Sequence, residues 1–159
     1  MVFVSRNNEL YSHAIFKSDM VYLSKDVSFC SAHKLYNDKW SKEVNEEIFG
    51  KCAHENYHGH NYDLTVTVKG EPHPETGMVM NFRDLKRVIK DELIAKVDHK
   101  NLNIDVDFLE GKMTTAEVFI KAIWEVLAPK IVKASEGNAQ LHKLKLYETR
   151  TSFAEYYGE

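Results

Sequence analysis

Residues 61–69 alternate between apolar and polar side chains, and this alternation limits the fold more than any other feature of the chain. Successive side chains of an extended strand point to opposite sides. One side of this strand would be apolar: Tyr62, Leu64, Val66 and Val68. A strand with one buried face and one solvent-exposed face is typical of an antiparallel sheet. We therefore predict that residues 61–69 are part of an antiparallel sheet.

Shorter patterns predict the neighbouring elements. Residues 21–29 and 143–147 are expected to be strands, and residues 42–48 a short helix within a long connection. Two prolines and two glycines in residues 70–77 predict a hairpin connection, followed by a short strand at residues 78–81.

Two longer helices complete the pattern. The first should end near Val97, and its apolar residues recur at helical spacing: Phe82, Leu85, Ile89 and Leu93. The second should begin at Thr114, which forms a capping-box pattern with Glu117, and Pro129 should help to end it. This order of elements predicts an α+β fold, with the helices on one face of an antiparallel sheet.

Composition sets limits on function. A chain of 159 residues is expected to form one domain, which we place at residues 21–159 after an N-terminal arm at residues 1–20. The net charge of −3 argues against nucleic acid or an anionic membrane as a partner. No apolar run is long enough for a membrane span or a signal peptide. With only Cys30 and Cys52, no disulfide framework is expected, and the protein is predicted to be cytoplasmic.

Three histidines are candidates for a metal site. His58 and His60 would lie on the same face of an extended segment, and His33 could supply a third imidazole from the first strand. Three imidazoles hold a zinc ion and leave its fourth position open, as in catalytic zinc sites. Two other interpretations remain open: a chance pair in a polar loop, or a helical pair of His54 with His58.

Two further groups have the chemistry to move protons. Cys52 would lie near such an ion, whose field would lower the pKa of its thiol; otherwise Cys52 is a buried structural cysteine. Asp98 would fix the tautomer of His99 if the chain bends there, since neighbouring residues on a regular element point apart. Otherwise His99 only complements the negative end of the helix dipole.

Two glutamates have the chemistry to bind a planar amidine-like group through paired N–H bonds. Glu148 interrupts an apolar strand end, and Glu117 lies in the first turn of a helix. The plain alternatives are a charge at a strand edge for Glu148 and a capping partner for Glu117.

Taken together, seven ordered segments resemble the 6-pyruvoyl-tetrahydropterin synthase family, which includes the 6-carboxy-tetrahydropterin synthases. The resemblance covers about residues 21–159. The segments that carry it are residues 29–33, 49–52, 58–62, 76–81, 98–102, 115–117 and 147–149.

The resemblance implies the tunnelling fold, a four-stranded antiparallel sheet with two helices on one face. Three subunits would form an oligomeric barrel, and two barrels would stack into a homohexamer with active sites between subunits. The implied reaction converts 7,8-dihydroneopterin triphosphate to 6-pyruvoyl-tetrahydropterin and eliminates triphosphate, with no external redox cofactor. Such an enzyme is a carbon–oxygen lyase of tetrahydrobiopterin biosynthesis.

The resemblance also implies residue roles. Cys52 would be the proton-abstracting thiol, and Asp98 with His99 a proton relay from a neighbouring subunit. The zinc ligands would be His33, His58 and His60. The pterin would be anchored by Glu148 with the help of Thr115 and Glu117.

Two positions depart from the main pattern. Glu55, with His58 and His60, matches the Glu-x-x-His-Gly-His signature of a subgroup that uses glutamate as base and forms 6-hydroxymethyl-7,8-dihydropterin. Otherwise Glu55 is a plain loop carboxylate. Cys30 stands where the family often has serine. The alternatives are therefore that product, 6-carboxy-tetrahydropterin, or a zinc-dependent pterin-binding protein without catalysis.

Overall fold

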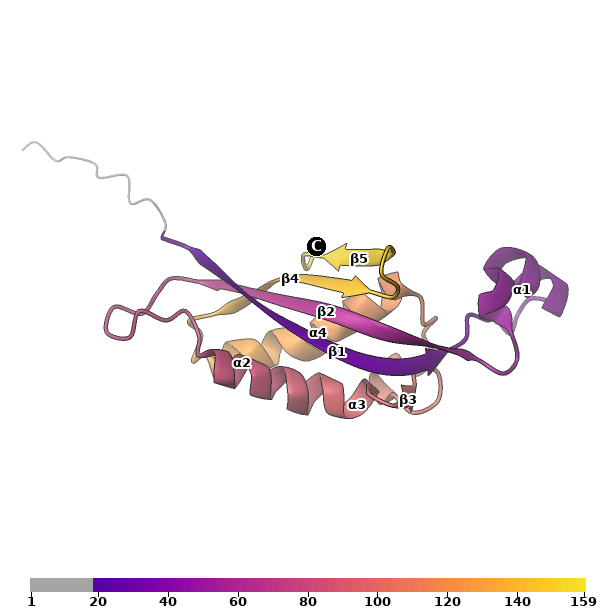
Figure 1. Cartoon of the computed structure of the whole chain (residues 1–159), viewed down its shortest axis with the longest axis horizontal. Helices are drawn as coiled ribbons and strands as arrows, with labels where there is room; N and C mark the ends of the chain where they lie inside the picture. Colours follow the sequence, from indigo (N-terminus) through magenta and orange to yellow (C-terminus); the bar gives the residue numbers. More distant parts are fainter. Residues whose placement is uncertain (1–18) are drawn as a thin grey trace, which may run out of the picture.

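A computed structural model describes residues 19–159, which form an α+β fold around a five-stranded sheet (Figure 1). The strand order is β3-β1-β2-β4-β5. The strands are β1 (Val21–His33), β2 (His58–Gly70), β3 (Lys100–Asn101), β4 (Gln140–Tyr147) and β5 (Phe153–Tyr156). The helices are α1 (Lys42–Phe49), α2 (Phe82–Ile89), α3 (Ala95–Val97) and α4 (Ala116–Ala134).

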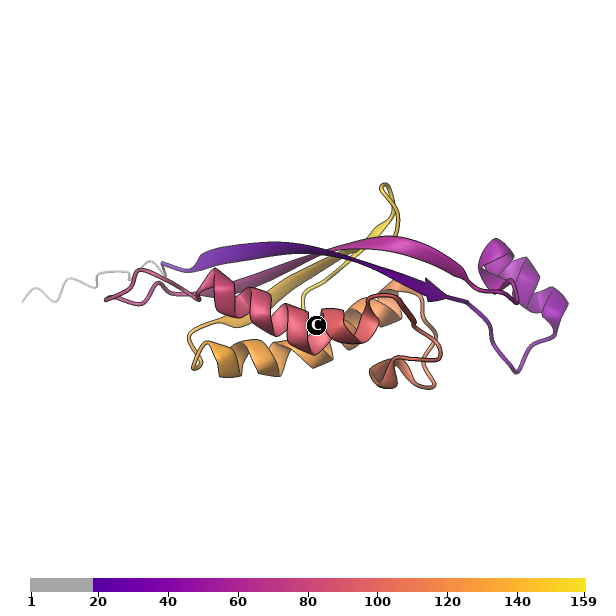
Figure 2. The same ribbon diagram turned by 60° about the horizontal axis from the view of Figure 1, so that its bottom comes forward.

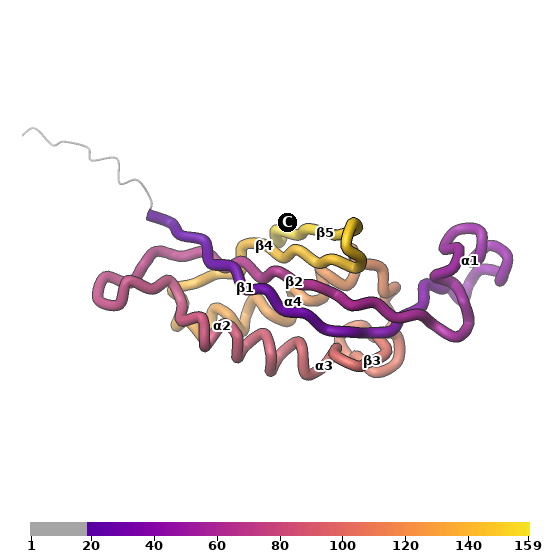
Figure 3. Tube along the Cα trace, viewed as in Figure 1, coloured from indigo at the N-terminus to yellow at the C-terminus, as the bar shows by residue number. Residues whose placement is uncertain are grey.

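The long antiparallel pair of β1 and β2 lies in the interior of the sheet, between β3 and β4. Its register runs without a break from Val21 opposite Gly70 to His33 opposite His58. The expected alternation on β2 is confirmed, because Tyr62, Leu64 and Val66 are buried. Both strands continue past the helices, and their far ends carry the connection that contains α1 (Figure 3).

The sheet differs in three ways from the expected four antiparallel strands, and the first is the additional strand β5 at Phe153–Tyr156. The short β3 pairs in parallel with β1, so the sheet is mixed and has five strands. Residues 78–81, expected to be a strand, form none. The Asn138 side chain donates to the backbone oxygen of Val79 at 2.8 Å, and Asn81 is already the N-cap of α2. The backbone groups of this segment therefore find partners outside the sheet.

The helices that cover the core lie on one face of the sheet, as expected (Figure 2). The predicted helix ending near Val97 is confirmed, with one irregularity. Between α2 and α3 the residues Lys90–Ile94 form a turn of π-helix. Such turns often accompany functional sites. This helical segment ends directly before Asp98.

The other long helix corrects two predictions. Its N-cap is Thr115 rather than Thr114, because the Thr115 hydroxyl accepts from the backbone N–H of Val118. Pro129 lies inside α4 and does not end it. The helix continues because Ile131, beyond the proline, is fully buried in the core and stabilises the last turns.

One hydrophobic cluster lies between the sheet and the helices, and Tyr62, Leu64, Phe119 and Ile123 are among its most buried members. Apart from residues 19 and 20, the predicted arm lies outside the described residues. Within residues 19–159, no helix is both long and apolar enough to cross a membrane.

We predict that Gly70→Ala destabilises the protein by about 1–3 kcal/mol, the usual cost of overpacking. A Cβ at Gly70 would collide with the backbone oxygen of Asn138 and lie 2.7 Å from Val79 Cγ1. Urea unfolding at a fixed protein concentration measures the change. The matched control is Gly59→Ala, whose Cβ would meet only the Ser31 oxygen at 3.6 Å. Equal shifts in the two variants would contradict the steric argument.

Candidate active site

Strand register brings the three predicted histidines together at one end of the sheet. His33 is directly opposite His58, and His60 is opposite Ser31, so all three imidazoles lie on the same face of the β1–β2 pair. His58 begins β2, and His54 lies outside any helix. The alternative of a helical His54–His58 pair is therefore wrong.

The three imidazoles have the spacing of a metal site. One ring nitrogen from each of His33, His58 and His60 lies within 4.8 Å of the other two. His33 Nε2, His60 Nε2 and both ring nitrogens of His58 are buried and have no hydrogen-bond partner. Buried polar atoms normally have partners, so these nitrogens fit a set of metal ligands.

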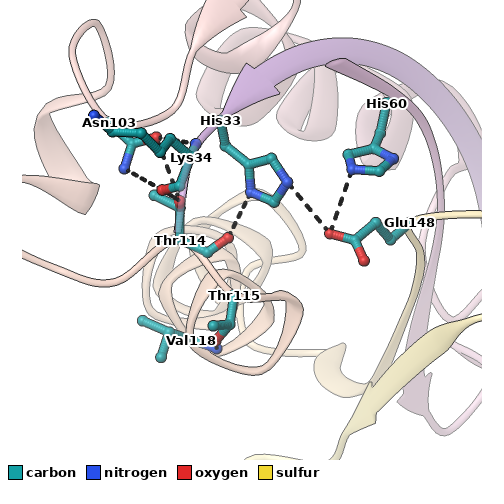
Figure 4. A network of polar contacts seen from close by, with 8 residues as sticks. All are labelled: His33, Lys34, His60, Asn103, Thr114, Thr115, Val118 and Glu148. Carbon is teal, nitrogen blue, oxygen red and sulfur yellow. Dashed lines mark hydrogen bonds and ion pairs between the residues drawn. The ribbon is translucent and has the colours of Figure 1, made fainter. Parts of the chain in front are cut away.

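A backbone oxygen fixes the tautomer of His33, the most buried of the three histidines. His33 Nδ1 lies 2.8 Å from the Thr114 carbonyl oxygen, which can only accept, so Nδ1 carries the proton (Figure 4). The Nε2 lone pair is then free to bind a metal. Burial lowers the pKa of both His33 and His58, which keeps these rings neutral.

The carboxylate of Glu148 also faces this group. Its Oε1 lies 3.5 Å from His33 Nε2 and 3.9 Å from His60 Nε2 (Figure 4). Glu148 directly follows β4, and its backbone N–H donates to Ser152 across the β4–β5 turn. The hairpin therefore holds the carboxylate beside the imidazoles.

Four of the predicted site residues line a single cavity of about 330 Å³: Cys52, Thr115, Glu117 and Glu148. Cys52 comes from the 3₁₀ turn Gly50–Ala53, and Thr115 and Glu117 from the start of α4. The volume is within the range of small-molecule sites, roughly 300–1,000 Å³. The cavity thus joins a thiol and two carboxylates from three separate parts of the sequence.

The electrostatic surroundings of Cys52 differ from the expected ones. Burial raises the pKa of the Cys52 thiol, and the negative charge of Glu148 raises it further. The protein's own groups therefore favour the protonated thiol. A lowered thiol pKa, as expected from the sequence, would need a nearby positive charge, such as that of a bound cation.

Glu55 lies apart from this cavity. Its side chain is exposed and lines a different hollow of about 650 Å³, together with Lys34, Lys42 and Glu46. The structure therefore groups Cys52, and not Glu55, with Glu148.

Asp98 and His99 lie at the edge of the sheet beside β1. The required bend is present, since His99 has a φ of 58° and its Nδ1 lies 3.1 Å from Asp98 Oδ1. The backbone N–H of Cys30 donates to Asp98 Oδ1 and holds the pKa of this carboxyl below its usual value. His99 lines a cavity of about 490 Å³ with Cys30 and Asn61, which is not the cavity of Cys52.

An α+β fold in which three clustered histidines, one buried and two half-buried, face a carboxylate whose cavity also holds a thiol has the groups of a metal-dependent enzyme. The sequence pattern of the 6-pyruvoyl tetrahydropterin synthase family matches residues 22–159, so the chain belongs to this family. The resemblance seen in the sequence is therefore confirmed.

Individual proteins agree with this assignment. The chain is 42% identical over 137 residues to the 6-pyruvoyl tetrahydrobiopterin synthase of Pongo abelii, covering 86% of this chain and 91% of that one. It is 42% identical over 142 residues to the enzyme of the same name from Dictyostelium discoideum, covering 89% and 99%. The solved 6-pyruvoyl tetrahydropterin synthase of Caenorhabditis elegans has a TM-score of 0.78 and 32% identity, covering 91% and 100%.

Sequence reasoning missed two residues of the site. Thr114 contributes through its backbone oxygen, so its side-chain type carried no signal. Tyr62 was assigned only to the core, yet its ring lies 5.6 Å from that of His60. Burial raises the pKa of the Tyr62 hydroxyl, which therefore stays protonated. Its position two residues after His60, on the same face of β2, was the available signal.

We predict that the metal-free protein alkylates slowly at Cys52, with a midpoint above the ordinary cysteine pKa of about 8.5. Burial and Glu148 both favour the thiol form. The rate of iodoacetamide alkylation against pH measures the midpoint in a Cys30→Ser background, which leaves Cys52 as the only cysteine. Adding zinc should move the midpoint down. A midpoint at or below the ordinary value without metal would contradict this electrostatic account.

Proposed function

We propose that this protein converts 7,8-dihydroneopterin triphosphate to 6-pyruvoyl-tetrahydropterin and eliminates triphosphate. It is a lyase that acts on a phosphate-bearing substrate. The observation that carries the proposal is the grouping of the histidine ligand set with Cys52 and Glu148 in a chain of this family.

The metal that fits the histidines is zinc. Three neutral imidazoles with one position left open are typical of a catalytic zinc site. When bound by His33, His58 and His60, zinc supplies a Lewis acid for the hydroxyl groups of the substrate's side chain.

The remaining groups bind the substrate and move protons. Glu148 accepts two parallel N–H bonds from the pyrimidine edge of the pterin, and Thr115 and Glu117 line the same cavity. Cys52 takes a proton from a side-chain carbon. The Asp98–His99 pair then acts as a second acid–base group, since Asp98 orients the imidazole of His99.

A complete active site of this kind needs groups from two subunits. In one chain, Cys52 lies by the cavity next to β5, and His99 lies beside β1 near the other edge of the sheet. Joining β5 of one subunit to the β1 edge of the next would bring these groups together. It would also cover apolar side chains at both edges, such as Val21, Tyr22 and Phe153, which are about half exposed. We therefore propose closed trimers of this kind, stacked as a homohexamer. The cytoplasmic location stays a prediction from the cysteine content.

We predict that Cys52→Ala lowers formation of the pyruvoyl product by about 10²–10⁴-fold, the usual contribution of a positioned acid or base. The matched variant is Glu55→Ala, which should leave the product unchanged, because Glu55 is exposed and lines a different hollow. Anaerobic incubation with 7,8-dihydroneopterin triphosphate, followed by mass analysis, identifies the pterins.

Other outcomes would favour the alternatives. Formation of 6-hydroxymethyl-7,8-dihydropterin, lost in Glu55→Ala, would assign that residue as the base of a cleavage reaction. Formation of 6-carboxy-tetrahydropterin would assign the third product. Recovery of intact substrate from the zinc-loaded protein would overturn the enzyme proposal and leave a pterin-binding protein.

We also predict that two inactive variants, Cys52→Ala and His99→Ala, recover activity when they are co-expressed. If each site takes Cys52 from one subunit and His99 from its neighbour, random assembly of equal amounts restores about a quarter of the wild-type activity. Purified mixed oligomers are assayed for pyruvoyl product.

The control for this experiment mixes Cys52→Ala with the double variant Cys52→Ala/His99→Ala, in which no complete site can form. Its activity should stay at background. If the Cys52→Ala and His99→Ala mixture also stays at background, the two residues act within one chain, and the proposed closure of the sheet is wrong.

A further inference from the structure

A second group of metal-ligating side chains lies outside the histidine set. One ligand atom from each of Cys30, Asp98 and His99 lies within 4.8 Å of the other two. Cys30 is opposite Asn61 in the β1–β2 register, one position away from the pair of Ser31 and His60. Cys30 therefore faces the opposite side of the sheet from the histidines.

Backbone contacts hold the elements of this group in place. The Cys30 N–H donates to Asp98 Oδ1 at 2.9 Å, and the His99 N–H donates to the Cys30 oxygen at 2.7 Å. The buried hydroxyl of Ser31 donates to the Val97 oxygen at 2.6 Å, which fixes the end of α3 against β1 (Figure 1). These hydrogen bonds hold the backbone that carries the three side chains against the end of β1.

His99 adopts a backbone conformation that is uncommon for a residue with a side chain. Its φ of 58° lies in the left-handed region, which costs free energy for residues other than glycine. Strain of this kind is kept where the surrounding structure enforces it, often at functional sites. Here the turn brings the imidazole back to 3.1 Å from the Asp98 carboxylate.

The ligand types select a particular kind of ion. A thiolate, a carboxylate and an imidazole are all zinc ligands, and the thiolate favours thiophilic metals such as zinc and cadmium over magnesium or calcium. The two negative charges balance a divalent cation. The group opens on the cavity of about 490 Å³ that Cys30 and His99 line, and in the single chain this cavity is open to solvent. Lys100, which also lines this cavity, is exposed.

We propose that Cys30, Asp98 and His99 form a second divalent-metal site, specific for thiophilic ions and separate from the three histidines. A metal bound there occupies both the carboxylate and the imidazole that we assign to proton transfer, so filling this site inhibits the enzyme. Inhibition rests on the proposed function, whereas binding rests only on the geometry of these three side chains.

Cadmium titration of the metal-free full-length protein tests the binding. Calorimetry should find two equivalents per chain in the wild type, and the second should add an ultraviolet cadmium–thiolate charge-transfer band. Cys30→Ser replaces the thiol by a hydroxyl group of similar size. It should weaken binding of the second equivalent by at least about 10-fold, since loss of a direct ligand should cost no less than loss of an outer-shell partner.

The matched control is Cys52→Ser, which removes the other thiol and should keep both the second equivalent and its band. A folded wild type that binds one equivalent, or a second equivalent that persists in Cys30→Ser, overturns the proposal. A band lost only in Cys52→Ser does so as well, because the thiolate ligand would then be Cys52.

The activity of the zinc-loaded enzyme separates this proposal from the proposed function. Micromolar excess zinc should inhibit the wild type and spare Cys30→Ser, whose catalytic groups are intact. If the second equivalent binds and activity is unchanged, the metal site stands and the role of Asp98 and His99 in proton transfer is wrong.

Discussion

The register between β1 and β2 is the constraint on which the site depends. Because His33 is opposite His58 and His60 is opposite Ser31, three imidazoles meet on one face of the sheet. A slip of one residue would send the β2 side chains to the other face and separate them from His33. The same slip would expose Tyr62, Leu64 and Val66, so the energy of the hydrophobic core enforces the geometry of the three histidines.

The site combines buried, neutral nitrogen atoms with a negative carboxylate. Burial lowers the pKa of His33 and His58, while Glu148 and burial raise that of Cys52. Without a cation, this arrangement holds a protonated thiol and leaves ring nitrogens without partners. A divalent cation resolves both conditions, since it takes the nitrogen lone pairs and favours a thiolate nearby. In the function that we propose, metal binding would therefore also lower the pKa of Cys52.

The candidate site residues lie toward two opposite edges of the sheet. Cys52 and Glu148 belong to the side that ends at β5, and Asp98 with His99 to the side that ends at β1 and β3. Hydrogen bonds from the backbone of Cys30 and His99 fix the second pair at the sheet margin. In the assembly that we propose, pairing of strand edges would complete such a divided site, and catalysis would then depend on assembly. The Cys30 thiol lies beside Asp98 and His99, where, by our proposals, a thiophilic ion would compete with proton transfer.

The sequence by itself determined the main strands, the helix that ends near Val97 and the identity of the three histidines, because these follow from local periodicity and side-chain chemistry. It did not determine that Pro129 stays inside α4, that residues 78–81 leave the sheet, or that β3 adds a parallel strand. Those outcomes depend on partners distant in the chain, such as Asn138 for Val79 and the buried core around Ile131. The pairing of Thr114 with His33 and the separation of Glu55 from Cys52 were likewise decided only by the tertiary structure. A backbone oxygen has the same chemistry in every residue, and the cavity that a loop side chain lines is set by packing rather than by spacing in the sequence.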